Sequence, residues 1–173
     1  MDKPKGLADR IETWMKKIPG VRSYKDREQR RETDKKLREH LASRLQEARS
    51  QLKKITLDLS AKNQMESLAK LDRFSSRLQQ MADTIRYASY GYSGIFDLEK
   101  IREDELDRLY SFDLLLADHL DKIQQGVVEV GQASSAYARE KKVEEAEGFL
   151  DVLETQFNRR KELIMPPPPP PGI

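Results

Sequence analysis

The sequence predicts an all-α fold, an elongated up-and-down bundle of three or four long helices with a short amphipathic N-terminal helix and a disordered polyproline tail. Apolar residues recur at steps of three and four along most of the 173 residues, as on one face of a helix. Hydrophobic residues (37%) barely outnumber charged ones (36%), and the mean hydropathy is -0.80. This ratio gives a thin core under a large solvated surface, which suits long helices better than a globule.

Residues 1–20 form the first expected unit, a short amphipathic helix ended by Pro19 and Gly20. Basic residues surround its apolar stripe, which consists of Leu7, Ile11, Trp14, Met15 and Ile18. Such a helix can dock on the bundle, or it can lie in an anionic membrane surface with Trp14 at the headgroup level. Binding to a protein partner is the third alternative.

Residues 21–164 form the expected bundle, and its first long helix covers about residues 26–60, which contain neither Gly nor Pro. Apolar residues repeat there at alternating steps of four and three, which is a heptad seam. The seam consists of Leu41, Leu45, Ala48, Leu52, Ile55 and Leu59. It closes either within one chain or between two, so self-association is one expectation.

A second long helix is expected over about residues 64–88, again with one apolar face at steps of three and four. That face carries Met65, Leu68, Leu71, Phe74, Leu78, Met81 and Ile85. Asn63 is placed to accept an amide hydrogen bond at its start. Because the connection is short, the two helices are expected to form an antiparallel hairpin.

Two further helices are expected over about residues 104–130 and 143–164. In the first of them Leu114, Leu115 and Leu116 point in three directions, so this helix is expected to be central and to pack on more than one side. The last helix has a simpler apolar face of Val143, Ala146, Leu150, Leu153 and Phe157.

Asp113 interrupts the apolar stripe of the 104–130 helix, where an unpaired carboxylate would be costly. Three outcomes are expected for it: a partner such as Arg86 or a tyrosine hydroxyl from residues 87–92, a position at the bundle end reached by water, or a raised pKa. The first is favoured, because the aromatic segment immediately precedes this helix.

The segment RYASYGYSGIFD, residues 86–97, is the most aromatic part of the chain. One interpretation is a plug over the end of the bundle, with rings between the helices and hydroxyls reaching water or backbone. The other is a binding patch, because tyrosines in loops make strong contacts at low entropic cost. The candidate residues are Tyr87, Tyr90, Tyr92 and Phe96.

Residues 165–173 form the expected tail, in which six consecutive prolines must adopt polyproline II. The tail is either a ligand for an aromatic groove or an inert spacer. With Trp14 and the aromatic segment, these prolines complete the candidate interaction surface: Pro166, Pro167, Pro168, Pro169, Pro170 and Pro171.

No motif for catalysis, metal binding or cofactor binding is found, so the protein is expected not to be an enzyme. The two histidines, His40 and His119, lack the Glu-x-x-His pattern of di-iron bundles, and without cysteine they cannot complete a common zinc site. The sequence GYSGI around Ser93 lacks the G-x-S-x-G spacing of a nucleophile elbow, and no phosphate-binding loop occurs.

The charge is unevenly distributed, with 17 basic and 10 acidic residues before residue 61 and 15 basic and 20 acidic ones after it. Nucleic acid is an unlikely partner, because no aromatic residue lies between Lys25 and Arg73 to stack on bases. The absence of cysteine and of a long apolar run favours a cytoplasmic protein, or one peripheral to the inner face of a membrane.

The segments IPGVRSYKDREQRRETDKKLREHLASRL and ASYGYSGIFD, with the LDRLYSFDLLL that follows, resemble a family of bacterial proteins of unknown activity. The resemblance implies a bacterial, cytosolic and all-helical protein, and it carries no catalytic or ligand residue. Together with the pattern of the chain, it favours a non-catalytic protein-interaction or scaffold bundle. The alternative is a peripheral membrane module anchored by the N-terminal helix.

Overall fold

The computed structural model describes residues 7–21, 24, 26–88 and 94–165. Over these residues the fold is all-helical, as predicted. It consists of α1 (Leu7–Met15), η1 (Arg27–Gln29), α2 (Arg30–Ala61), α3 (Leu68–Arg86), η2 (Ile95–Asp97), α4 (Glu103–Gln132) and α5 (Ala136–Ile164), where η1 and η2 are single 3-10 turns. The predicted polyproline tail lies outside the described residues.

The largest difference from the predicted boundaries is at α5, which begins at Ala136 rather than at about residue 143. Ser135 caps this helix, because its hydroxyl accepts a hydrogen bond from the amide of Ala138 (3.1 Å). The residues up to Lys142 carry few large apolar side chains, so the apolar stripe alone did not reveal the two additional turns.

The turn between α2 and α3 differs from the expectation for Asn63. Asn63 has a φ of 56°, in the left-handed region that asparagine tolerates, and it ends α2 rather than starting α3. The amide of Gln64 donates to Leu59 O (2.9 Å) and that of Asn63 donates to Ser60 O (3.1 Å). This is the Schellman pattern, which satisfies the last carbonyls of a helix.

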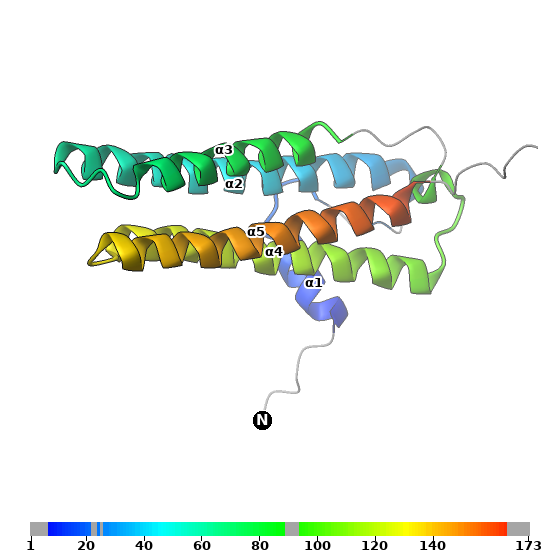
Figure 1. Cartoon of the computed structure of the whole chain (residues 1–173). Helices are drawn as coiled ribbons and strands as arrows, with labels where there is room; N and C mark the ends of the chain where they lie inside the picture. The colour runs from blue at the N-terminus through cyan, green and yellow to red at the C-terminus, as the bar shows by residue number, and fades with distance from the viewer. Residues whose placement is uncertain (1–6, 22–23, 25, 89–93, 166–173) are drawn as a thin grey trace, which may run out of the picture.

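The long helices form two layers, α2 with α3 and α4 with α5 (Figure 1). Arg44 of α2 pairs with Asp121 of α4 (2.7 Å), and nearer the starts of these helices Asp34 and Asp113 both meet Arg160. Thus α2 and α4 run in the same direction, as expected when consecutive helices alternate up and down. The connection from α3 to α4 therefore crosses the end of the bundle.

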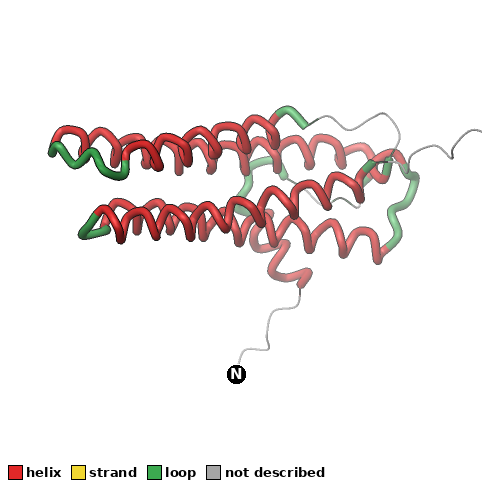
Figure 2. The backbone as a smooth tube through the Cα atoms, in the orientation of Figure 1, coloured by secondary structure: helices red, strands yellow, loops and turns green. Residues whose placement is uncertain are grey.

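The two ends of the bundle are built differently, as Figure 2 shows. One end holds the two tight turns, residues 62–67 and 133–135, and is called the turn end. The other holds the start of α2, the end of α5 and the connection from α3 to α4, and is called the loop end. Each of the four long helices extends between these two ends.

The main core lies between the four long helices and includes the predicted heptad seam, which closes within one chain. Leu116 of α4 is fully buried, and α4 packs against α1, α2 and α5, as predicted for a central helix. A second apolar cluster closes the loop end. Its buried members are Ile11, Met15, Tyr24, Ile95, Phe96, Leu106, Leu109, Leu114 and Ile164.

Helix α1 docks on the outside of this bundle. Ile11 and Met15 are buried in the loop-end cluster, and Ile18, just after the helix, is buried in the main core. Arg10 adds an ion pair with Asp118 of α4 (3.7 Å). Of the alternatives that the sequence leaves open for α1, the structure shows docking on the bundle.

Candidate functional site

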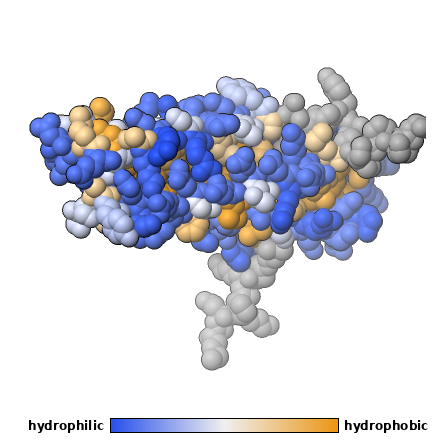
Figure 3. Space-filling view, viewed as in Figure 1, coloured by the Kyte–Doolittle hydropathy of each residue, from blue (hydrophilic) through white to orange (hydrophobic). Residues whose placement is uncertain are grey.

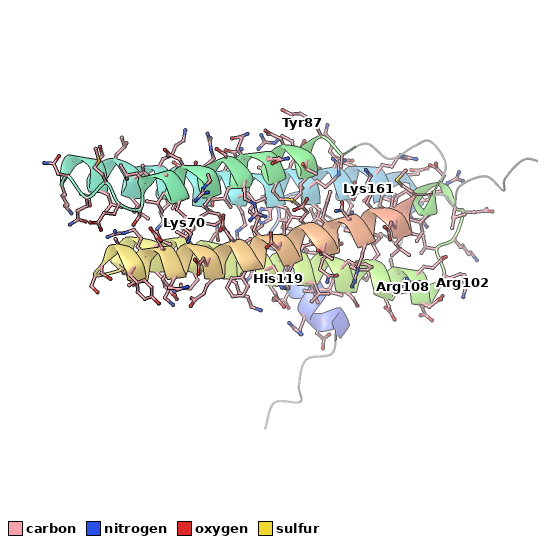
Figure 4. All side chains as sticks on the ribbon, in the orientation of Figure 1. Lys70, Tyr87, Arg102, Arg108, His119 and Lys161 are labelled. Carbon is pink, nitrogen blue, oxygen red and sulfur yellow. The ribbon has the colours of Figure 1, made fainter. Side chains whose placement is uncertain are left out.

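The three predicted interaction residues that the structure describes, Trp14, Tyr87 and Phe96, do not form one exposed surface. Phe96 is only 3% exposed and stacks on Tyr24, with ring centroids 5.8 Å apart, so it acts as the plug that one interpretation expected. Trp14 is half-buried against both cores. Tyr87 is 74% exposed at the end of α3 (Figure 4). Tyr90, Tyr92 and the prolines 166–171 lie outside the described residues.

Arg160 of α5 organises a buried ionic network at the loop end. Its Nε donates to Asp113 Oδ1 (2.5 Å), its Nη1 lies 2.8 Å from Asp34 Oδ1, and its Nη2 donates to the hydroxyl of Tyr24 (2.9 Å). Asp34 also accepts from Arg38 Nε (2.8 Å). The network therefore joins α2, α4, α5 and the segment before α2.

Asp113 has Arg160 as its charged partner, so the expectation of Arg86 is wrong. The reason is the path of the chain: the connection from α3 crosses the bundle end, and the end of α5 lies beside α4 instead. A further expected outcome is also present, because burial raises the pKa of Asp113 to about 6 against the attraction of Arg160.

Two more contacts hold the loop-end network in place. Arg30 donates from Nε to Tyr24 O (2.7 Å) and from Nη1 to Leu98 O (2.5 Å). Burial, with the nearby charge of Asp113, raises the pKa of Tyr24 well above its ordinary value. Arg160, Asp34, Asp113 and Tyr24 are each at most 1% exposed. A substrate could reach them only if the bundle opened, so the geometry gives this network a structural role.

A cavity of about 340 Å³ lies at the turn end, between the two turns. One wall comes from the α2–α3 turn and the other from the start of α5. The polar lining residues are Asn63, Gln64, Glu66, Ser134, Ser135 and Arg139. The first amides of α5 have no partner within the helix, so the second wall has the positive end of a helix dipole.

Arg139 is the unusual member of this lining, because it is a nearly buried cation (6% exposed) without a carboxylate partner among the described residues. Its Nη2 donates to Ala133 O (3.3 Å), just past the end of α4, and its buried Nε has no hydrogen-bond partner. A buried charge of this kind is costly unless something neutralises it.

Large apolar side chains are exposed around the same end. Leu57 (70% exposed) lies one turn before the end of α2, Met65 (58%) lies in the turn, and Tyr137 (74%) lies in the first turn of α5. Figure 3 shows apolar surface at this end, and also along the middle of the face and toward the loop end. Exposed apolar side chains are typical of sites that bind other molecules when they form a continuous patch.

The remaining polar groups are better explained as surface structure. Lys70 lies between α3 and α5 (Figure 4), where it pairs with Glu144 (2.6 Å). His119 is half-buried, with its Nδ1 2.7 Å from Leu115 O. His40 is half-buried, and burial lowers its pKa, with Arg44 as a second cause. In the described part of the chain, His, Asp and Glu side chains form no group of three suited to a metal ion.

The turn-end residues were missed because the sequence analysis sought aromatic segments and motifs. A usable signal exists in α5, where Arg139 and Arg160 both fall on the inward stripe. That stripe runs through Arg139, Val143, Ala146, Leu150, Leu153, Phe157, Arg160 and Ile164, at alternating steps of four and three. An arginine on such a stripe predicts either a buried partner or a ligand.

The chain matches no protein-family model, no characterised protein and no solved structure in the comparisons made. Within the described residues, none of the helices has both the length and the apolar character needed to cross a bilayer. The geometry of the two bundle ends is therefore the basis on which function is proposed.

Proposed function

We propose that this protein is a non-catalytic interaction or scaffold bundle whose docking surface is the turn end. The observation that carries the proposal is the exposure of Leu57, Met65 and Tyr137 on the elements that form the turn end, beside a polar cavity that none of the three lines. Exposed apolar side chains that are not needed for the core are suited to bury against a partner.

The loop end supports this assignment by contrast. Its aromatic side chains Tyr24 and Phe96 are buried and stacked on each other, so they hold the fold together, whereas Tyr87 at the end of α3 is 74% exposed. Its one strongly perturbed carboxyl, Asp113, is enclosed with Arg160. The carboxyl of Asp113 and the guanidinium of Arg160 are thus paired inside the bundle, out of reach of a substrate. This favours a binding role for the protein over a catalytic one.

The alternative role, a membrane module anchored by α1, has less support. Ile11 and Met15, which would insert into a membrane, are buried against the bundle. Insertion would first require α1 to leave α4 and expose part of the loop-end cluster. A liposome flotation assay with anionic lipid checks this alternative, and we expect no flotation at physiological salt.

Site-specific photo-crosslinking tests the proposed docking surface. A photoreactive phenylalanine analogue in place of Met65 should give a discrete adduct with one protein in native cells. The matched control replaces Leu115, an apolar residue exposed in the middle of α4. The same adduct from both positions, or an adduct from position 115 alone, would contradict docking at the turn end. An adduct between two copies of the chain would identify self-association as the interaction.

A further inference from the structure

Arg139 at the turn end has no carboxylate partner among the described residues, unlike Arg160 at the loop end. Arg160 meets two carboxylates, whereas Arg139 is nearly as buried and meets only the carbonyl of Ala133. Its unpartnered Nε belongs to a side chain that lines the cavity between the two turns. The Nε itself is enclosed, so an anion from outside would be bound by the Nη groups, whose planar donors match a carboxylate or a phosphate.

We propose that the turn-end cavity is a subsite for a carboxylate, the side chain of an Asp or Glu in a partner protein, with Arg139 as its anchor. This inference rests on the proposed docking at the turn end and adds the chemistry that the partner must present. The positive end of α5 and the hydroxyl of Ser134 provide further donors around the guanidinium.

The charges around the cavity favour a carboxylate over a phosphate. Arg139 is its one lining cation, and Glu66 brings a negative charge to the opposite wall. Nearby lysines are engaged elsewhere, since Lys62 pairs with Asp58 (2.7 Å) and Lys70 pairs with Glu144 (2.6 Å). Arg139 and a helix end, set against Glu66, give the lining only a small positive charge, which opposes a doubly charged phosphate more than a single carboxylate.

The exposed apolar residues favour a side chain within a segment over a free chain end. Met65 belongs to the α2–α3 turn and Tyr137 belongs to the first turn of α5, the two elements that supply the walls of the cavity, although neither residue lines it. A segment that crosses the cavity can place apolar neighbours against both residues while its central acid reaches Arg139. A chain that stops at the cavity could contact only one side.

Arg139 also has a structural use, because its bond to Ala133 O caps the carboxyl end of α4. That bond uses one Nη2 hydrogen and leaves Nε without a partner. The capping role alone predicts no response of Arg139 to an added acid, whereas the proposed subsite does. The two roles are therefore separable by a binding measurement on the folded protein.

The test is a titration of the whole protein with two capped peptides, acetyl-Leu-Asp-Leu-amide and its uncharged match acetyl-Leu-Asn-Leu-amide. Binding is followed by NMR through the Nε–H of Arg139 and the backbone amides of residues 134–139. We expect the Asp peptide to bind with a dissociation constant on the order of 1 mM. The Asn peptide should bind at least about tenfold more weakly, because it lacks the charge-assisted bonds.

Three variants make the assignment specific. Arg139→Gln should weaken binding of the Asp peptide at least about tenfold. Arg159→Gln removes the same charge from the exposed face of α5 at the loop end and should leave binding within about twofold. Glu66→Gln should strengthen binding about two- to fivefold, because it removes a repulsion that solvent partly screens. Glu66 is exposed and Gln has nearly the same size, so this last variant is expected to fold normally.

Equal binding of the two peptides, or unchanged binding by Arg139→Gln, would overturn the carboxylate subsite. Tighter binding of inorganic phosphate than of the Asp peptide at matched ionic strength would also overturn it. If the Met65 photo-adduct still forms in that case, docking at the turn end stands and only the subsite fails. If neither the Met65 photo-adduct nor selective binding of the Asp peptide is observed, the proposed docking surface is itself wrong.

Discussion

The loop end and the turn end of this bundle each contain a buried arginine on the same stripe of α5, yet their surroundings differ. Arg160 is fully buried between Asp34 and Asp113, which α2 and α4 supply. Arg139, at 6% exposure, faces a cavity and a helix-terminal carbonyl. Equivalent positions along one helix can thus meet carboxylates within the described chain or meet only a carbonyl, depending on what the neighbouring helices supply.

The two ends also differ in how they use aromatic residues. At the loop end Tyr24, Phe96 and Tyr110 fill the space between segments, and the ring centroids of Tyr24 and Tyr110 lie 5.6 Å apart. At the turn end Tyr137 lies outside the core and is 74% exposed. The loop end therefore encloses a second apolar cluster, although Tyr87 there is as exposed as Tyr137 at the turn end.

The largest expected contrast in stability comes from one aromatic at each end. Phe96→Ala should lower the free energy of unfolding by about 3 to 5 kcal/mol, because it removes a buried ring and leaves a cavity. Tyr137→Ala should change it by less than about 0.5 kcal/mol, as is usual for an exposed side chain. Denaturant unfolding measures both. Similar losses would mean that the turn end is also part of the folded core.

The dependence of stability on pH should have opposite signs at the two ends. The pKa of Asp113 is raised to about 6, so between about pH 4 and pH 6 the folded state binds a proton that the unfolded state lacks. This carboxyl therefore favours folding at low pH, and its contribution is lost as the pH rises through about 6. The stability of the native protein relative to Asp113→Asn should fall from pH 4 to pH 7.

Glu144, which joins α5 to α3 on the turn-end side, should behave in the opposite way. Lys141 and then Lys70 lower the pKa of its exposed carboxyl to about 2. Its contribution is present above about pH 4.5 and is lost as the pH falls toward 2. Unfolding curves of the native protein and Glu144→Gln should therefore converge in acid. A difference between them that grows as the pH falls would contradict this assignment.

The smallest expected effect concerns the ion pair between Lys70 and Glu144. Lys70→Met should lower stability by at most about 1 kcal/mol, because such pairs are partly solvated. The difference should shrink as salt rises from about 0.01 to about 1 M, which shortens the Debye length from about 30 to about 3 Å. Denaturant unfolding at the two salt concentrations checks this. A loss that does not respond to salt would indicate packing of the lysine stem instead.

The spacing of apolar residues predicted the helical class and the four long helices, since one apolar stripe per helix is a local property. It also singled out Asp113, because a carboxylate on such a stripe needs a partner. The identity of that partner was not predicted: Arg160 is 47 residues away in sequence, and it meets Asp113 because α4 and α5 pair antiparallel within one hairpin, which brings the end of α5 beside the start of α4. The start of α5 was missed because a polar cap, Ser135, rather than the stripe defines it.

The candidate site at the turn end was harder to predict than the fold. The sequence directed attention to Trp14 and to the aromatic segment, and of these Trp14 and Phe96 pack into the cores. Arg139 and Arg160 occupy equivalent positions on the stripe of α5, so the sequence of α5 alone gives no reason to separate them. Only the positions of Asp34 and Asp113, set by tertiary packing, distinguish the paired arginine from the unpaired one.

The most direct test of these different roles is the stability of Arg160→Met and Arg139→Met, measured by denaturant unfolding at pH 7. Arg160→Met should lose about 3 to 5 kcal/mol, because it leaves buried carboxylates unpaired. Arg139→Met should change stability by less than about 1 kcal/mol in either direction, since the lost bond to Ala133 offsets relief of a buried charge. If both variants lost about 3 kcal/mol or more, Arg139 would be as important to the fold as Arg160. That result would contradict the proposal that the turn end is a binding surface.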